Sequence, residues 1–285
     1  MRKDSASRMK EYERRLAEDA MPTTIISGFG RFSIPDLGEG HVAGMGCISP
    51  EEINVNGSSQ LPGGIRVGNI TTSGSSTIRG DLEASRMKFS GSTTIRGALV
   101  FDRLEGSGSI RTGGGARGDS MRVSGSCNID GVVELEEGLI ASGSFSTKGD
   151  VVSKGSVELD GSFDIEGKLE AETLEARLSR SRSRVDGGVK AGYIDIRKGS
   201  KYNRIPSFAA RLLKRGRGEG ELVTTNIHGR TEVNLENVTC DDVTGRKVTI
   251  GEGCEIRGTV RYIESIEVHP EAIVRKSPEK LGSLT

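Results

Sequence analysis

Residues 74–90 read GSSTIRGDLEASRMKFS, and residues 91–107 read GSTTIRGALVFDRLEGS. The two stretches follow one template, in which a Gly opens the unit and a second Gly follows six positions later. Units of this template begin at Gly40, Gly57, Gly74, Gly91, Gly108, Gly125, Gly143 and Gly161, spaced by 17 residues five times and by 18 residues twice. A Ser follows every opening Gly except the first, where His41 stands. A repeat of this length determines the architecture more strongly than any local signal.

Apolar residues also recur at fixed positions of the unit, and many of them lie two residues apart, as Met87 and Phe89 do. This period of two is typical of a strand and not of a helix. Each unit therefore predicts three short strands turned at glycine, with four apolar columns pointing inward. Because 17 or 18 residues are too few for a strand and a packed helix, the pattern predicts an all-β solenoid with one unit per coil. Stacked coils would lie about 4.8 Å apart.

The repeated pattern of residues 74–92 resembles the bactofilins, a family of polymer-forming cytoskeletal proteins, and most closely its longer, many-repeat members. The resemblance extends over about residues 25–275 and is strongest from 57 to 176. It implies a single-stranded right-handed β-helix with an apolar interior and flexible tails. It also implies assembly into filaments without a nucleotide.

The composition agrees with a narrow solenoid interior. The 285 residues include 41 Gly, no Trp and only 4% aromatic residues. Lys plus Arg and Asp plus Glu number 40 each, so no electrostatic attraction to nucleic acid is expected. A net charge near zero also permits copies of the chain to associate.

We expect a cytoplasmic protein, and its association with a membrane surface is left open. No apolar run approaches the roughly 20 residues of a membrane span, and no apolar segment of the secretory type follows the basic N-terminus. The four cysteines have no CxxC spacing, which favours reduced thiols.

The chain divides into three parts and one insertion. These are a helical N-terminal arm at 1–22, a β-helix at 23–275 with regular coils over 40–178 and a helical insertion at 200–221, and a disordered tail at 276–285. Residues 23–39 depart from the template and predict an irregular first coil or a cap, because an open solenoid end exposes strand edges and apolar side chains.

The arm and the insertion each carry apolar residues beside basic ones. Met9, Tyr12 and Leu16 form one face of the arm, and Phe208, Leu212 and Leu213 form that of the insertion. The arm is interpreted as solvated, as a membrane-surface helix or as a partner-docking helix. The insertion is interpreted as packed on the outside of the solenoid or as a membrane or partner contact.

We expect no catalytic, metal or cofactor site. The three His residues lie far apart in sequence, and no GxSxG, HExxH or P-loop motif occurs. The expected function is a structural one, in which the chain assembles with itself end to end and scaffolds envelope or cell-shape factors. The alternative is a β-helix carbohydrate-active enzyme or binding module that uses an outer face of the solenoid.

Self-association would use the apolar columns and strand edges at the two ends. The residues expected to form the polymerisation interface are Phe29, Phe32 and Ile34 at the N-terminal end and Ile263, Ile266, Val268 and Ile273 at the C-terminal end. The expected mechanism is continuation of the strand ladder from one copy into the next.

Overall fold

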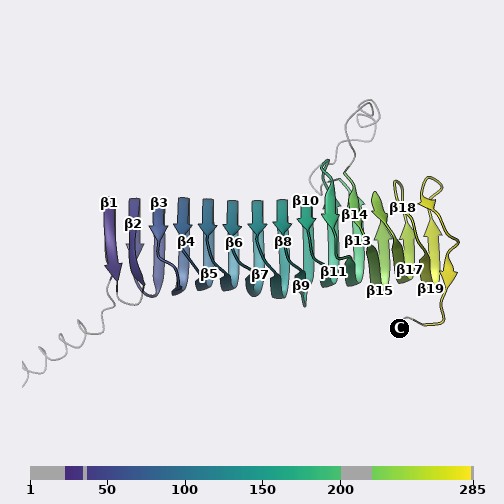
Figure 1. Cartoon of the computed structure of the whole chain (residues 1–285), viewed down its shortest axis with the longest axis horizontal. Coiled ribbons are helices and arrows are strands. Elements are labelled where there is room, and N and C mark those ends of the chain that lie inside the picture. Colours follow the sequence, from purple (N-terminus) through teal and green to yellow (C-terminus); the bar gives the residue numbers. More distant parts are fainter. Residues whose placement is uncertain (1–22, 35–36, 200–219, 284–285) are drawn as a thin grey trace, which may run out of the picture.

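The computed structural model describes residues 23–34, 37–199 and 220–283. Within these residues the regular secondary structure consists of 21 β-strands, which together form one continuous sheet. The sheet winds into a solenoid of about 12 turns, drawn in Figure 1 as a row of stacked coils. The expected all-β solenoid is thus confirmed. The arm at 1–22 and residues 200–219 of the insertion lie outside the described residues, and so do the helices expected there.

The strands fall into two groups along the chain. The first group is β1 (Thr24–Ile34), β2 (Gly38–Ile48), β3 (Glu52–Leu61), β4 (Ile65–Ile78), β5 (Leu82–Ile95), β6 (Leu99–Thr112), β7 (Ala116–Ile129), β8 (Val133–Thr147), β9 (Val151–Ser153), β10 (Ser156–Ile165) and β11 (Leu169–Leu178). The second group is β12 (Ser183–Val185), β13 (Val189–Lys198), β14 (Leu222–Thr224), β15 (Asn226–Leu235), β16 (Val238–Cys240), β17 (Asp242–Ile250), β18 (Glu255–Ile256), β19 (Val260–Val268), β20 (Ile273–Val274) and β21 (Glu279–Lys280).

Each coil has three sides, and each side buries two side chains. In β4 the buried pairs are Ile65 with Val67, Ile70 with Thr72, and Ser76 with Ile78. We name these sides 1, 2 and 3, and the names extend to the residues of other coils that pair in register with them. Exposed or half-exposed residues separate the sides and form the corners. The interior therefore has six columns, where the sequence pattern predicted four.

The two further columns mix polar and apolar residues, which hides them in the sequence. One contains Ser59, Ser76 and Thr93 before it becomes apolar towards the C-terminus. These hydroxyls are satisfied inside the solenoid, since the Ser59 hydroxyl donates to the Ser76 hydroxyl at 2.9 Å. The hydroxyls of Thr72 and Thr93 also hydrogen bond to each other at 2.9 Å. Buried polar groups carry little penalty when they are paired in this way.

The two columns require glycine for different physical reasons. Gly91, in the column that opens each unit, has φ +101°, and a Cβ there would lie 2.4 Å from the carbonyl oxygen of Gly74 in the preceding coil. Gly80, in the second column, lies in the turn between β4 and β5. A Cβ on Gly63 would lie 2.6 Å from the Cα of Gly80, so the stacked turns approach too closely for a side chain.

Aromatic side chains in the core fill space that a neighbouring glycine leaves free. The Phe89 ring lies 2.2 Å from where a Cβ of Gly106 would be, and the Phe101 ring lies 2.5 Å from that of Gly118. Gly106 and Gly118 stand one coil after these aromatics in the ladder. Large and small residues therefore alternate along a column to keep the packing dense.

The regular parallel array begins later than predicted. The sequence template placed its first unit at Gly40, but β2 contains this residue and pairs antiparallel with both β1 and β3. Parallel stacking starts with the pairing of β3 and β4. The corner glycine of β2 is Gly44, because a reversed strand meets Gly57 at that residue. The His41 that replaces the usual Ser marks this departure in the sequence.

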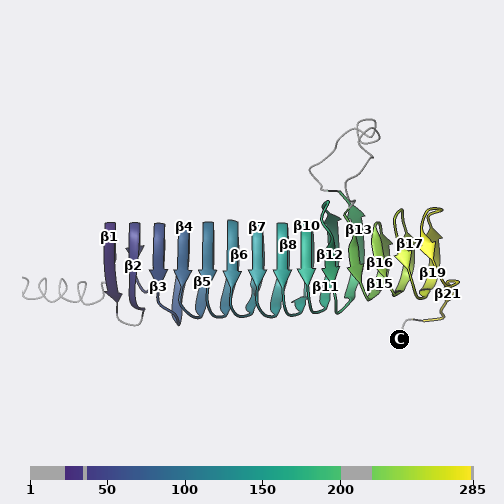
Figure 2. The ribbon, with the colours of Figure 1, turned by 45° about the horizontal axis from the view of Figure 1, so that its top comes forward.

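Beyond β11 the coils lose the regular spacing but keep the ladder. Val185 in β12 pairs with Thr224 in β14, so the segment between β13 and β14 is inserted between two sides of one coil. Register shifts occur in the pairings of β13 with β15, β15 with β17, and β17 with β19. The described strands run from Thr24 to Lys280, with β1 at one end of the row and β19 and β21 at the other (Figure 2).

Candidate association surfaces at the ends of the solenoid

The N-terminal end is closed by the antiparallel hairpin of β1 and β2. Its inward-facing residues Ile26, Phe32 and Ile34 are 7%, 5% and 2% exposed, and Leu37 in the connecting turn is also buried. The Phe32 ring occupies the space that a side chain on Gly40 would fill. The hairpin thus buries its own apolar residues within a single chain, in the region where an irregular first coil or a cap was expected.

The hairpin aligns with sides 2 and 3 and adds no strand on side 1, where Ile65 and Val67 are nevertheless 2% and 5% exposed. In the ladder, Thr24 and Ile26 align through β2 and β3 with Ile70 and Thr72 of side 2. Phe32 aligns in the same way through Gly40 with side 3. Among the described residues, β1 pairs only with β2, so its other edge presents unpaired backbone groups.

The C-terminal end is open. The last coil contributes the inward-facing residues Val260, Tyr262, Ile266, Val268, Ala272 and Val274. Only Val260 is buried, and Val268 is 43% exposed. The residues one coil earlier, Val248 under Ile266 and Ile250 under Val268, are 1% and 0% exposed. The apolar columns therefore end at a layer that nothing in the described chain covers on sides 2 and 3.

Side 1 of the last coil is covered by β21. Glu279 and Lys280 pair in parallel with Arg261 and Tyr262 of β19, and the Arg261 guanidinium lies 3.4 Å from the Glu279 carboxylate. The sequence predicted disorder from residue 276 onward, and this was wrong for the two residues of β21. The polar composition of the tail concealed a strand that needs only backbone partners.

The expected interface residues are divided by the structure into three kinds. Ile266 and Val268 lie in the open layer at the C-terminal end. Phe32 and Ile34 are buried within the cap, so their side chains are not available at the surface. The remaining three point elsewhere: Phe29 and Ile273 face outward, 74% and 56% exposed, and Ile263 lies at a corner of the last coil. The expected contact residues Met9, Tyr12, Leu16, Phe208, Leu212 and Leu213 lie outside the described residues.

An exposed apolar patch lies on the outer wall of the hairpin, and of its residues only Phe29 was predicted as an interface residue from the sequence. It consists of Ile25, Phe29 and Met45, which are 81%, 74% and 62% exposed, with Cys47 opposite Ile25. Phe29 packs against His41, with ring centroids 6.1 Å apart. Phe29 and Met45 flank corner glycines, where the regular coils carry small Ser residues. That departure from the template was the available signal.

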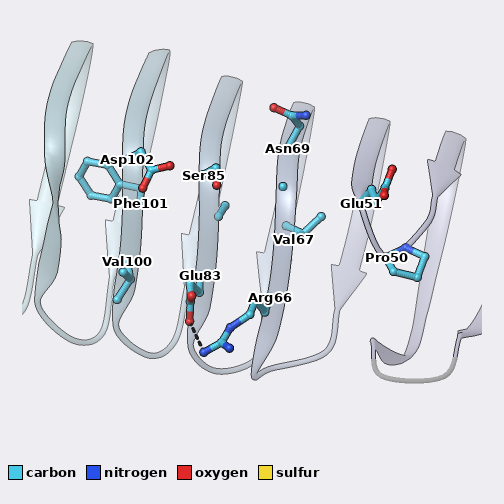
Figure 3. A pocket seen from close by; sticks show the side chains of 12 residues that line it. Pro50, Glu51, Arg66, Val67, Asn69, Glu83, Ser85, Val100, Phe101 and Asp102 are labelled. Carbon is cyan, nitrogen blue, oxygen red and sulfur yellow. Dashed lines mark ion pairs between the residues drawn. The ribbon is translucent and has the colours of Figure 1, made fainter.

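A shallow groove of about 600 Å³ runs over the outer surface of the first coils (Figure 3). It extends from Pro50 and Glu51, past the ion pair of Arg66 and Glu83 at 2.7 Å, to Asp102. Its polar side chains come from successive coils and do not converge on one point. No described residues form a group of three or more His, Cys, Asp or Glu able to hold a metal ion.

The buried thiols are poor nucleophiles. Burial raises the pKa of Cys127 to about 12 and that of Cys254 to about 11. The pKa of Cys240 is also raised, mainly by burial and to a smaller extent by the neighbouring Cys254. All three thiols therefore remain protonated at neutral pH and act as small apolar residues of the interior.

Comparison with known proteins gives no further assignment. No helix among the described residues is long and apolar enough to cross a membrane. No family model, no curated protein and no solved structure matches this chain.

Proposed function

We propose that this protein is a structural subunit that assembles with itself end to end into filaments, without a nucleotide, and that these filaments scaffold envelope or cell-shape factors. The proposal includes the right-handed winding and the cytoskeletal role that the resemblance to bactofilins implies. It also treats the protein as a scaffold and not as an enzyme.

The observation that carries the proposal is the open apolar layer at the C-terminal end. Ile266 and Val268 continue columns that are buried in the coil before, at Val248 and Ile250, and they end beside strand edges with unpaired backbone groups. A strand edge of this kind pairs with another chain unless it is blocked. Covering the two side chains with a second copy would add only part of the roughly 1.5–3 kcal/mol that full burial of such a side chain gives, because Ile266 is already half-buried and Val268 is 43% exposed.

The test is sedimentation and negative-stain microscopy over a range of concentrations without nucleotide. The parent chain is expected to form filaments about one solenoid wide. Ile266→Lys places a charge in the open layer and is expected to abolish them, because an unpaired charge cannot be buried in an apolar junction. Val100→Lys is the matched control, since Val100 is 44% exposed on the side wall in the middle of the solenoid and should tolerate the charge.

Two results would contradict the proposal. One is a parent chain that stays monomeric at every concentration, and the other is an Ile266→Lys variant that assembles as well as Val100→Lys. A monomer would direct attention to the groove over the first coils and to the alternative of a carbohydrate-binding or carbohydrate-active outer face.

A further inference from the structure

Resting on the proposed self-assembly, we infer that copies of this chain join head to tail. In this arrangement β1 of one copy adds to the last coil of the next, and every subunit of a filament points in the same direction. The inference concerns which ends meet, and it follows from strand direction, from coverage of the three sides and from register.

The direction of β1 matches that of the coils. β1 is antiparallel to β2, and β2 is antiparallel to β3, so β1 runs parallel to β3 and to every coil that follows. A parallel ladder can continue only into a strand of the same direction. The free edge of β1 therefore has the direction that the free edge of β19 requires in a neighbour that points the same way.

The two ends also cover complementary sides. At the C-terminal end sides 2 and 3 are open, while β21 lies on side 1. At the N-terminal end the hairpin stands on sides 2 and 3 and adds no strand on side 1. Joined head to tail, the hairpin of one copy meets the open sides of the other, and β21 lies on the side where the hairpin adds no strand.

The register brings inward residues onto inward residues. Followed through the ladder, Thr24 takes the column of Ile266, Ile26 that of Val268 and Phe32 that of Val274. The register thus aligns the columns across the junction, with the backbone of β1 as the contact, since Ile26 and Phe32 already pack within their own hairpin. The outward-facing Ile25 and Glu267 would become neighbours on the outer wall of side 2.

The corner glycine of β1 is free in the direction where a neighbour would lie. A Cβ on Gly74 would meet the carbonyl oxygen of Gly57 at 2.5 Å, on its N-terminal side. Gly28 has a similar φ of +92°, yet a Cβ there would meet no atom of the described residues within 4 Å. The space at Gly28 is the place that the last coil of another copy would occupy.

A filament with symmetric junctions needs two different contacts, one between N-terminal ends and one between C-terminal ends. Each of these would have to form without the match of sides and register described above. A head-to-tail junction uses both ends in one kind of contact, and such a heterologous contact generates an open-ended filament when it does not close.

The test is disulfide cross-linking between two differently sized versions of the chain. Both carry Cys47→Ser, because Cys47 lies opposite Ile25 in the hairpin and would capture a cysteine placed there. One version carries Ile25→Cys and the other Glu267→Cys. Adjacent strands place paired Cα atoms about 4.8 Å apart, which is within the roughly 4.4–6.8 Å range for a disulfide.

After mixing under assembly conditions and mild oxidation, the mixed dimer is expected to be the major cross-linked species. When the second version carries Glu264→Cys in place of Glu267→Cys, most of the mixed dimer should be lost, because Glu264 is exposed but out of register with Ile25. Dimers of Ile25→Cys alone would show a head-to-head junction, and dimers of Glu267→Cys alone a tail-to-tail junction. Either result, or filaments without cross-links, would overturn the inference while leaving the proposed function intact. Chains that stay monomeric would refute both.

Discussion

Replacement of Gly91 by Ala tests whether the corner glycines hold the solenoid together. Gly91 has φ +101°, a conformation that costs an L-residue about 1–2 kcal/mol. Its Cβ would also lie 2.4 Å from the Gly74 carbonyl oxygen, which belongs to the backbone and cannot move aside alone. Overpacking of this kind costs about 1–3 kcal/mol. We therefore expect Gly91→Ala to lower the free energy of unfolding by about 2–5 kcal/mol, the sum of these two ranges.

Gly28→Ala is the matched control. Gly28 has φ +92° at the same corner, but a Cβ there meets nothing within 4 Å in the part of the chain that the structure describes. In dilute, monomeric protein this variant should lose only the conformational term of about 1–2 kcal/mol. At concentrations where filaments form, it should assemble less than the parent chain, since the added methyl would meet the last coil of a neighbour.

The measurement is urea unfolding followed by circular dichroism, with amide hydrogen exchange of β4, β5 and β6. Exchange is needed because stacked repeats do not always unfold in one step. Equal losses for Gly91→Ala and Gly28→Ala in the monomer would refute the argument from close stacking. A loss below about 1 kcal/mol for Gly91→Ala would refute the argument from positive φ as well.

Three further predictions concern the interior. Gly106→Val should lower the urea midpoint, because the new side chain collides with the Phe89 ring at a cost of about 1–3 kcal/mol. Adding Phe89→Ala to this variant should recover part of the lost stability. No recovery would contradict the packing of Phe89 against Gly106. In native protein at pH 8, Cys127 should resist alkylation while the exposed Cys47 reacts, and mass spectrometry of the labelled peptides distinguishes the two. Because burial raises the pKa of Cys127 from 9.0 to about 12, the unfolded chain loses that proton first, and stability should fall as pH rises between these values.

The sequence pattern was sufficient to predict the solenoid but not its ends. Period-two spacing and stacked glycines specify coils wherever the template repeats, and these features come from local geometry. Ser76 and Gly106 both occupy interior positions that a hydrophobicity pattern does not reveal. The Ser76 hydroxyl is hydrogen-bonded to the Ser59 hydroxyl, and Gly106 leaves room for the Phe89 ring. Their role becomes visible only when the neighbouring coil is in place.

The ends were harder because the chain changes direction there. Nothing in the spacing of Gly40 shows that its strand is antiparallel, and that reversal buried Phe32 and Ile34, which were expected at the surface. The C-terminal columns were predictable to the extent that they continue the alternating pattern, as Ile266 and Val268 do. The outward direction of Ile273 depends on the pairing of β20 with β18, which a two-residue strand does not reveal in the sequence.

The hairpin at the N-terminus has a consequence for how the chain folds during synthesis. Its strands contact each other across short loops, down to the pair of Ile34 and Gly38, whereas the coils pair residues at least 15 apart. Contacts that are local in sequence form with the smallest loss of chain entropy. The hairpin is also the first part of the domain to leave the ribosome, so it can serve as a nucleus on which each later coil is templated as it emerges. The coil of β19 and β20 is then the last of the described coils to be added, and only β21 pairs with it afterwards.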